Sequence, residues 1–531
     1  MKRWPLIVLS LFFATAAHAD TTFVSGTVGG VWDLSGNPYI VQGSPLIPAD
    51  STLEIQRGVR IEFQGPFAFI VQGIMNCLGD IGDSIYFTQD TVDFPDRWQG
   101  LRFSSVDQPS LMRCVVAEFG GSYNGTIRVT DSQLTLEHAT VRNCAIQSFN
   151  VDGGQVVLSD CHFADNGVQG GCGGSLRAQD ATISLQNCRF ERSGALDGAG
   201  LCVYRTSLTA YSCTFDHNEG AIWGGTIYAD DSDLDFRNCI FESNAAIMGA
   251  ATYIIGESST IFERCVFARN HAVRNGTEGT YGALFLPANG PHRISNCLFY
   301  RNVGMNNGAI FANGIVTIEQ SVFVENTDNP IIGGSPDSVR YNAFHVRPPS
   351  LSGMPSGFGI LTETNGNGDS TDIYGNFFSD PGFDPAGQYG EFSLSFDSHL
   401  RDAGNPNGTP DPDGTIPDLG PYPYFWLQAI DDLTLYRVGE SLDINLRWSS
   451  IPEAVEYRVY RTSGGEFDWD AAYYVGTTDS AGFLHQNAFS DTQNSYTYIV
   501  IAFDSHQAIT WQIPEHVRHI TSDSDPAFFG N

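Results

Sequence analysis

Three acidic residues recur at nearly equal spacing and form the most regular pattern of charged groups in the chain. Glu191, Asp216 and Glu242 each stand three positions after a cysteine in the same Cys-x-Phe sequence. Carboxylates in such a row repel one another unless a cation joins them, and their oxygens are ligands that Ca²⁺ prefers. Arg189 and Arg192 lie beside the first of them. We predict a binding site at these five residues, the alternative being a solvated acidic face.

A second acidic cluster lies in the sequence "DPDGTIPDLG", which places Asp411, Asp413 and Asp418 around Gly414. Alternating Asp before Gly begins many calcium loops, but the later bidentate Glu of an EF-hand is absent here. Two interpretations remain open: a polar turn that closes the preceding domain, or a Ca²⁺ site. Ca²⁺ is the only cofactor that the sequence suggests. We predict no catalytic residue, because no GxSxG, HExxH or P-loop sequence occurs.

A repeated sequence, apolar-x-apolar-x-x-Cys-x-Phe, must position the first site. The repeat recurs mostly every 22–27 residues, at Cys161, Cys188, Cys213, Cys239, Cys265 and Cys297, with Ser321 in the equivalent position. Alternating apolar residues predict a strand, and the out-of-step position before the cysteine predicts a bend into a second strand. Repeats of this length stack as coils. We therefore predict a solenoid with three short strands in each coil.

Stacked coils place equivalent residues in ladders, with each strand paired to its copy about 4.8 Å away. We expect Cys and Phe to point inward, and Asn five positions after Cys to bond the bend and its neighbours. Cysteines that share one ladder position need not have bridging geometry, so we expect buried free thiols. Whether Cys77, Cys144, Cys172 or Cys202 form disulfides stays open.

Together with the repeat, two segments resemble the right-handed parallel β-helix family of secreted bacterial proteins, which has a pectate-lyase-like fold. They are "STLEIQRGVRIEFQGPFAFIVQG" at 51–73 and "DRWQGLRF" at 96–103, and the sequence at 402–425 resembles the segment that often closes such helices. The resemblance covers residues 22–425 and implies the fold. It implies no single function, because the family includes lyases, hydrolases, epimerases and adhesins.

The cysteine ladder ends near Leu427, after which the expected strands become longer. The sequences at 442–465 and 494–504 resemble a fibronectin type III domain, and Trp448 and Tyr457 stand where that family has core aromatic residues. The resemblance implies a small β-sandwich whose aromatic residues are buried. Such modules act mostly as spacers or binding appendages.

The first residues have the pattern of a signal peptide: Lys2 and Arg3, an apolar run, and a small-x-small cleavage site before Asp20. The fold class is therefore all-β, a right-handed parallel β-helix solenoid followed by a small fibronectin type III-like β-sandwich. The expected parts are a signal peptide at 1–19, the β-helix at 20–401, a closing segment at 402–425, the fibronectin type III-like domain at 426–520 and a flexible tail at 521–531.

The formal net charge is −33, and Lys2 is the only lysine. Such a chain is repelled by nucleic acid and by anionic membrane surfaces, which excludes both as partners. No apolar stretch is long enough to span a membrane. We expect a secreted protein, extracellular or at the cell surface, whose partners are polysaccharide or cell-envelope components.

These observations favour a non-enzymatic surface or matrix protein whose β-helix binds glycans or envelope components. The alternative is a Ca²⁺-dependent polysaccharide lyase, or another carbohydrate-active enzyme, that acts on acidic polysaccharide. In lyases of the resembling family, acidic residues hold Ca²⁺ against a uronate while Lys or Arg removes a proton. Arg189 or Arg192 could take that role only with a strongly lowered pKa.

Overall fold

The computed structural model forms two compact units, Met1–Val339 with Arg347–Phe358, and Arg340–Val346 with Gly359–Asn531. It describes residues 21–521 with gaps. The gaps are 90–91, 95, 107, 122–124, 168–169, 275–276, 279–280, 288–289, 306, 313–314, 328, 333–338, 346–353, 386–389, 396, 412–414, 425–432, 438–442, 451–455, 464–472, 487, 489–494 and 504–517.

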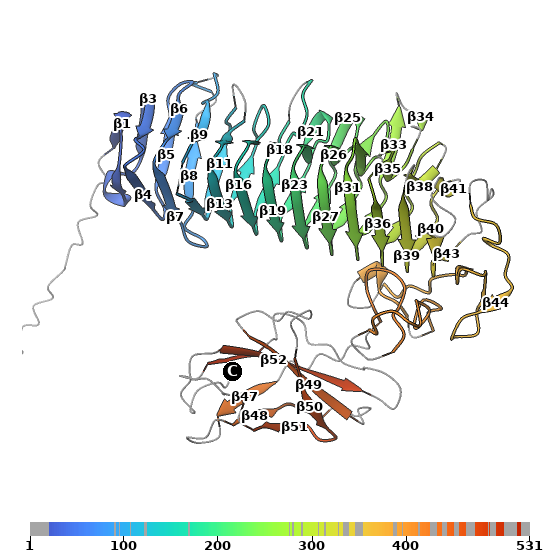
Figure 1. Cartoon of the computed structure of the whole chain (residues 1–531). Helices are drawn as coiled ribbons and strands as arrows, with labels where there is room; N and C mark the ends of the chain where they lie inside the picture. Colours follow the sequence, from blue (N-terminus) through green and yellow to red (C-terminus); the bar gives the residue numbers. More distant parts are fainter. Residues whose placement is uncertain are drawn as a thin grey trace, which may run out of the picture. The chain divides into compact units, whose positions relative to one another are not determined.

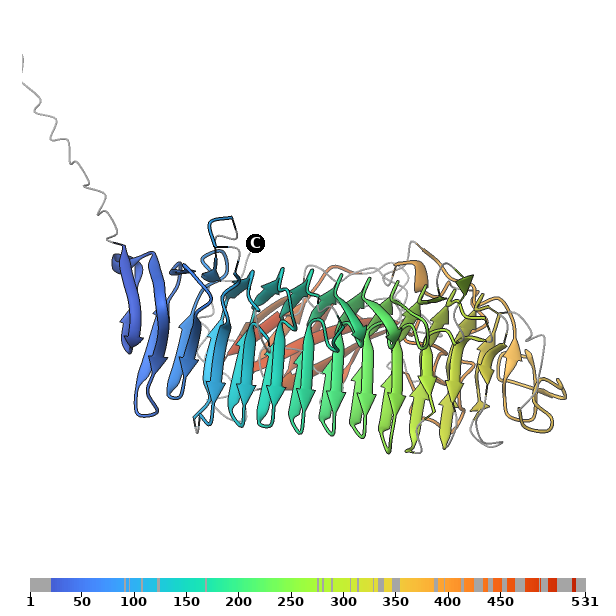
Figure 2. The ribbon, with the colours of Figure 1, turned by 90° about the horizontal axis from the view of Figure 1, so that it is seen from above.

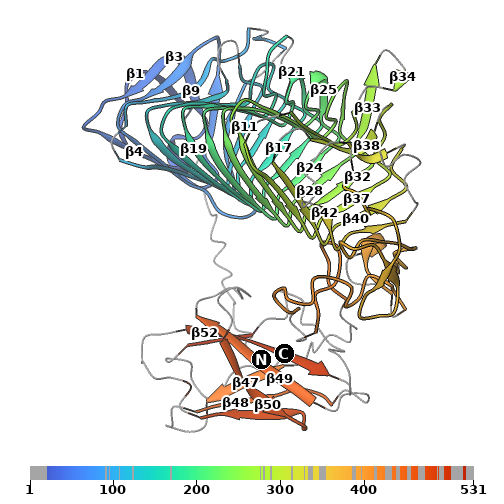
Figure 3. The same ribbon diagram turned by 45° about the vertical axis from the view of Figure 1, so that its right-hand side comes forward.

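The first unit is a solenoid in which each complete coil gives one strand to each of three parallel faces (Figures 1 and 3). Face 1 consists of β2 (Gly30–Trp32), β4 (Thr52–Gln56), β7 (Ile74–Leu78), β10 (Ser110–Arg113), β13 (Gln133–Glu137), β16 (Gln155–Ser159), β19 (Thr182–Gln186), β23 (Ser207–Tyr211), β27 (Asp233–Arg237), β31 (Ser259–Glu263), β36 (His292–Ser295), β39 (Val316–Glu319) and β42 (Val339–Arg340). Face 2 consists of β5 (Arg60–Phe63), β8 (Ile85–Thr88), β11 (Val115–Glu118), β14 (Thr140–Arg142), β17 (His162–Ala164), β20 (Arg189–Glu191), β24 (Thr214–Asp216), β28 (Ile240–Glu242), β32 (Val266–Ala268), β37 (Leu298–Tyr300) and β40 (Val322–Val324). Face 3 consists of β6 (Ala68–Val71), β9 (Gly100–Ser104), β12 (Ile127–Thr130), β15 (Phe149–Asp152), β18 (Leu176–Gln179), β22 (Leu201–Tyr204), β26 (Ile227–Asp230), β30 (Thr252–Ile255), β35 (Leu284–Leu286), β38 (Asn307–Ala312) and β41 (Asn329–Ile332). The predicted three-strand coil is thus confirmed.

The first coil is less regular than those that follow. The long strand β3 (Tyr39–Ile47) pairs with both β5 and β6 and therefore spans faces 2 and 3, and β1 (Thr22–Thr27) pairs with β3. Two inward side chains, Trp32 and Tyr39, stack with ring centroids 4.5 Å apart and close this end of the core.

A side sheet grows from the connections between faces 2 and 3, where the coils differ most in length. It consists of β21 (Gly194–Asp197), β25 (Glu219–Trp223), β29 (Ala245–Ala246), β33 (His271–Arg274) and β34 (Thr277–Glu278). The first four strands are parallel, and β34 turns back antiparallel to β33. Figure 2 shows the successive coils that carry it, seen from above.

Single residues in the left-handed conformation make the corners of the coils. Asn187 and Asn238, each directly before a ladder cysteine, have φ of 52° and 54°. The sequence predicted a bend at this position, and Asn tolerates the left-handed region better than most residues. A second corner, four positions after the cysteine, carries Arg192 and His217 at φ of 49° and 51°. Arg does not favour this conformation, whereas His is enriched in it, and the corner lies directly before the position of the ladder asparagine, where a bend was expected.

The aromatic ladder lies inside the coils, as predicted. Phe190, Phe215, Phe241 and Phe267 are register partners on face 2. Their rings stack nearly parallel, with centroid distances of 5.1 Å for the first pair and 4.8 Å for the next two. Because the stack is continuous, each coil helps to bury the rings of its two neighbours.

The predicted asparagine ladder is also present. Asn244 donates from Nδ2 to the carbonyl of Phe215 at 3.0 Å and to Oδ1 of Asn270 at 3.0 Å. Its backbone N–H donates to the same Oδ1, and Asn218 bonds Asn244 in the same way. These buried amides satisfy backbone groups at a corner that no strand can pair.

The ladder cysteines are free thiols, as expected. Cys239 donates from Sγ to the carbonyls of Arg237 and Ala210, at 3.3 and 3.5 Å. Burial raises the pKa of its thiol well above the ordinary value. Of the four cysteines whose pairing the sequence left open, Cys172 and Cys202 form a disulfide, whereas Cys77 and Cys144 are buried and free.

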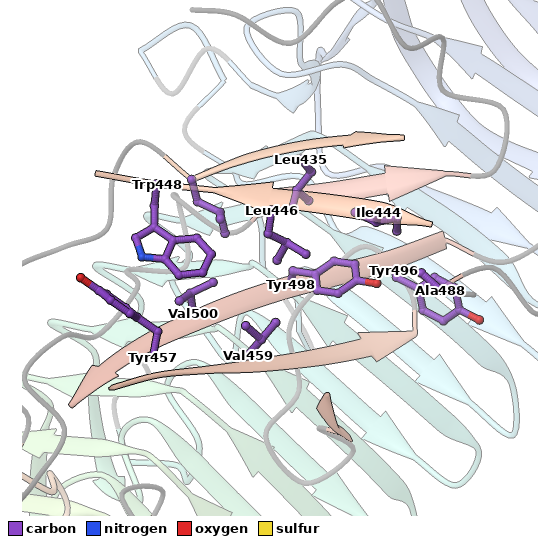
Figure 4. Packing of buried hydrophobic residues seen from close by; sticks show 11 residues of the cluster. Leu435, Ile444, Leu446, Trp448, Tyr457, Val459, Ala488, Tyr496, Tyr498 and Val500 are labelled. Carbon is purple, nitrogen blue, oxygen red and sulfur yellow. The ribbon is translucent and has the colours of Figure 1, made fainter. Parts of the chain in front are cut away.

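The second unit contains a short continuation of the ladders and two antiparallel sheets. Its strands are β43 (Ala343–Phe344), β44 (Glu363–Thr364), β45 (Ser370–Thr371), β46 (Phe377–Phe378), β47 (Thr434–Arg437), β48 (Ile444–Arg447), β49 (Glu456–Ser463), β50 (Tyr473–Thr478), β51 (Gly482–His485), β52 (Ser495–Phe503) and β53 (Arg518–Thr521). One sheet has the order β47-β48-β51 and the other β50-β49-β52-β53. Between them lie Trp448, Tyr457 and Tyr498, all buried (Figure 4).

Helical structure is nearly absent, in agreement with the all-β prediction. In the ranges that the structure describes, the helices are two short 3₁₀ segments, η1 (Leu34–Gly36) and η2 (Gly390–Phe392). None of the described helices has the length and apolar character needed to cross a membrane.

Candidate functional site

The acidic row that the sequence singled out runs along the outer side of face 2. Glu191, Asp216 and Glu242 are direct register partners on β20, β24 and β28. Parallel pairing thus brings side chains together that are about one coil apart in the sequence. What joins them decides whether the row can bind a metal or a ligand.

Glu191 is the centre of a network of ion pairs. Its carboxylate lies 2.5 Å from Nε of Arg189, 2.5 Å from Nη1 of Arg192 and 3.1 Å from Nε2 of His162. Burial acts to raise the pKa of Glu191, but the three basic side chains outweigh it, and the pKa lies below its usual value. Glu191 is therefore an ionised carboxylate held by two guanidinium groups, with the His162 ring beside it.

The network extends in both directions from Glu191. Arg189 also donates from Nη2 to Asp216 at 3.1 Å, and Asp216 lies 2.6 Å from Nδ1 of His217. On the other side, Arg192 makes two hydrogen bonds to Asp165, at 2.8 and 2.9 Å. The pairing with Asp165, reinforced by Glu191, raises the pKa of Arg192. The predicted neighbours thus do contact one another, through guanidinium groups.

Glu242, the third carboxylate of the row, lies outside this network. It pairs with Arg269, whose Nη1 is 2.5 Å from its Oε1. Across the described residues, no group of three or more His, Cys, Asp or Glu side chains is arranged to hold a metal ion. Between Glu191 and Asp216, where the sequence suggested Ca²⁺, the guanidinium group of Arg189 joins the two carboxylates.

A cleft opens at the corner beside the network. It has a volume of about 510 Å³. Its lining consists of Arg97, Phe119, Asn143, Cys144, Asp165, Asn166, Gly167 and Arg192. Arg97 donates from Nη1 to the carbonyl of Asn143 at 2.6 Å. Two guanidinium groups, a carboxylate and two carboxamides thus converge on one open space.

Sequence reasoning missed Arg97, although it belongs to the quoted segment "DRWQGLRF". The residue precedes β9 and is not part of the repeat, so no spacing connects it with Arg192 or Asp165. Only the stacking of coils brings them to one cleft. Cys144, which also lines the cleft, has its pKa raised to about 11 by burial and is therefore a protonated, unreactive thiol at neutral pH.

A second cluster that the sequence analysis missed lies where the side sheet meets face 3. Trp223 stacks with Tyr253 at 5.6 Å between ring centroids, and Tyr253 stacks with Tyr228 at 5.9 Å. The backbone N–H of Trp223 donates to Asp197 at 3.3 Å. The disulfide between Cys172 and Cys202 links the loops to the face at this place. The sequence does contain a sign of this cluster, because an aromatic residue recurs at the same position of successive face 3 strands.

The second predicted site is only partly described. Asp413 lies outside the described residues. Asp411 accepts a hydrogen bond from the backbone N–H of Asp418, and Asp418 accepts from the N–H groups of Asp402 and Tyr424 at 2.7 and 2.6 Å. Both carboxylates are buried and hold the turn together. This agrees with the polar-turn interpretation, while the Ca²⁺ interpretation stays a prediction.

Comparison with known proteins supports the architecture of the first unit. A family model described as "Right handed beta helix region" matches residues 125–281. The crystal structure of pectate lyase Pel9A aligns with 70% of this chain and 88% of its own, at 14% identity and a TM-score of 0.34. No curated protein matches the chain. The family model and the three parallel faces together confirm the predicted β-helix fold, and the function is not determined.

Proposed function

We propose that this right-handed β-helix belongs to an exported, non-enzymatic protein that binds a glycan in the cleft at the corner of face 2. The observation that carries the proposal is the lining of that cleft. Arg97 and Arg192 supply planar sets of N–H donors, and Asp165 supplies carboxylate acceptors. Sugars present hydroxyl groups that both donate and accept, and some also carry carboxylates. A cleft with both kinds of partner on rigid coils suits them.

The network behind the cleft supports binding rather than proton abstraction. Arg192 holds two carboxylates and its pKa is raised, so it keeps its proton at any physiological pH. Arg189 is likewise held by Glu191 and Asp216. A base in a lyase must release its proton, which these ion pairs oppose. The network instead fixes Arg192 at the cleft wall, as a binding site requires.

Three further features belong to the proposal. The signal peptide at 1–19 implies export, and the disulfide between Cys172 and Cys202 suits an oxidising compartment. The two antiparallel sheets around Trp448 and Tyr457 suit a fibronectin type III-like module that acts as a spacer or appendage. Polysaccharide or cell-envelope components are then the partners.

Binding of the purified protein to a polysaccharide panel tests the proposal, with Arg97→Gln as the informative variant. Its guanidinium has one carbonyl partner and no carboxylate partner in the part of the chain that the structure describes, so its loss should leave the fold intact. We expect at least a tenfold weaker binding, on the order of 1.4 kcal/mol. Arg205→Gln is the matched control, since Arg205 is exposed and pairs with Asp180 at another corner.

Three results would contradict the proposal. Failure of the wild-type protein to bind any polysaccharide would remove the binding function. If Arg97→Gln bound polysaccharide as tightly as the wild-type protein does, the binding site would lie outside the cleft. If incubation of the protein with uronan substrates produced new absorbance at about 235 nm, as unsaturated uronates do, the Ca²⁺-dependent lyase would replace the non-enzymatic interpretation.

A further inference from the structure

The first coil of the solenoid leaves an open edge on all three faces. In the described part of the chain, β1 pairs with β3 and β2 pairs with β4, each on one side only. The register of β1 breaks between Val24 and Gly26, so that Thr22–Val24 continues face 2 and Gly26–Thr27 continues face 3. With β2 on face 1, a whole coil of backbone N–H and C=O groups faces outward.

This edge lacks the charges with which proteins usually protect exposed strands. Natural edge strands are blunted by charged side chains, proline or covering segments, because an open edge pairs readily with another strand. Residues 21–32 read TTFVSGTVGGVW and contain no charged side chain, although the chain as a whole carries a formal charge of −33. The nearest following charge, Asp33, accepts hydrogen bonds from Ser35.

Large apolar side chains are also exposed at this end. Phe23 on β1 is 63% exposed, Val31 on β2 is 57% exposed, and Leu34 in η1 is 52% exposed. Their inward neighbours Val24 and Trp32 are buried and complete the core, so the outward set is not needed to fill it. Exposed apolar groups beside an open, uncharged strand edge are the features of an interaction surface.

We propose that the first coil is a self-association surface through which two copies of this chain meet end to end. The distribution of charge favours a second copy of this chain as the partner at this surface. A net charge of −33 makes most other contacts between copies repulsive, whereas the strand edges formed by residues 21–32 contain no charged side chain and can approach without bringing like charges of these strands together. A twofold axis across the end would pair β1 with β1 of the other copy in antiparallel fashion. Phe23 and Val31 would be buried by the same contact.

Sedimentation of the exported full-length chain over a broad concentration series tests the proposal. We expect a monomer–dimer equilibrium in the wild-type protein. Val31→Lys and Phe23→Lys should each raise the dissociation constant at least tenfold, because an unpaired charge would enter the contact. Ile81→Lys is the control, since Ile81 is 81% exposed in the loop between β7 and β8 and should leave the equilibrium unchanged.

Three different results would contradict the self-association proposal. A monomer at every concentration would overturn the proposal, and so would covering of the edge by residues that precede Thr21. A dimer that Val31→Lys and Phe23→Lys leave intact would place the contact elsewhere and equally overturn it. Melting curves of the variants show whether each remains folded, because their side chains point outward and their loss should not change the core.

Discussion

At the scale of single residues, Arg192 connects the shape of the coil with its charge network. Its φ of 49° is a conformation that costs a non-glycine residue about 1–2 kcal/mol. Its guanidinium group bonds Asp165 and Glu191, and these contacts offset that cost. The sequence predicted which charged residues are neighbours. It could not predict that guanidinium groups would join the carboxylates, because the repeat determines strand register but not the directions of long side chains.

Removal of the charge at Glu191 should destabilise the fold. We expect Glu191→Gln to lower the free energy of unfolding by about 1.5–3 kcal/mol at pH 7, the range for hydrogen bonds to charged groups. Glu242→Gln is the control, because Glu242 is more exposed and, among the residues that the structure describes, its ion-pair partner is Arg269, so its loss should cost about 1 kcal/mol or less. Urea unfolding of both variants measures the difference. Equal effects would show that the enclosed network contributes nothing beyond a surface pair.

The effect of Glu191 should also depend on pH in a defined direction. Its pKa in the folded protein lies below the ordinary value of 4.5. Its stabilising contribution is therefore fully present above that value and is lost as the pH falls through the lower, folded pKa. Urea titrations should show the difference between wild type and Glu191→Gln shrinking as the pH falls below about 4. A difference that grows in acid would contradict the assignment.

At the scale of elements, the repeat predicts two faces well and the third poorly. Val156, Leu158 and Phe163 alternate at fixed distances from Cys161, so β16 and β17 could be read directly from the sequence. Face 3 follows loops of varying length, so its strands have no fixed distance from the preceding cysteine, and only counting back from the following cysteine would have located them. For the same reason the pairing of Cys172 with Cys202, both in or next to those loops, could not be predicted.

The aromatic ladder gives the sharpest test of the inward row. Phe241 is fully buried between Phe215 and Phe267, so Phe241→Ala should lower the free energy of unfolding by about 3–5 kcal/mol through lost burial and a cavity. Thr214 lies on the outer side of the neighbouring strand, and Thr214→Ala should change it by about 0.5 kcal/mol or less. Denaturant unfolding compares them. Similar losses would mean that the two rows do not differ in burial.

At the scale of the whole molecule, the excess of acidic residues shapes both stability and partners. A formal charge of −33 produces repulsion within the folded chain that any cation reduces. Specific binding of Ca²⁺ must therefore be separated from general screening. The acidic turn at Asp411, Asp413 and Asp418 allows specific binding to be separated from screening. The carboxylates of Asp411 and Asp418 already accept hydrogen bonds from backbone N–H groups, so variants of this turn distinguish a structural role from metal binding.

We predict that millimolar Ca²⁺ raises the melting temperature more than Na⁺ does at equal ionic strength, since a ligand of the native state stabilises it. Asp413→Ala should lose most of that gain. Asp418→Ala should melt lower with or without Ca²⁺, because its carboxylate accepts two backbone N–H groups. Thermal melts in Ca²⁺ and in EDTA measure this. If the wild-type protein gave the same melting curve in Ca²⁺ and in EDTA, the cluster would be a turn that binds no metal.

In an exported protein, as proposed above, folding of the solenoid competes with oxidation of its buried thiols. Each ladder thiol is shielded from oxidants only after its own coil has stacked, whereas in the unfolded chain eleven cysteines can join in many wrong pairs. Coils must therefore close faster than oxidation proceeds. Once they have closed, every later opening risks capture in a mispaired form that cannot refold. The working lifetime of such an exported protein is then limited by how rarely the solenoid opens, which is a property of its unfolding rate rather than of its equilibrium stability.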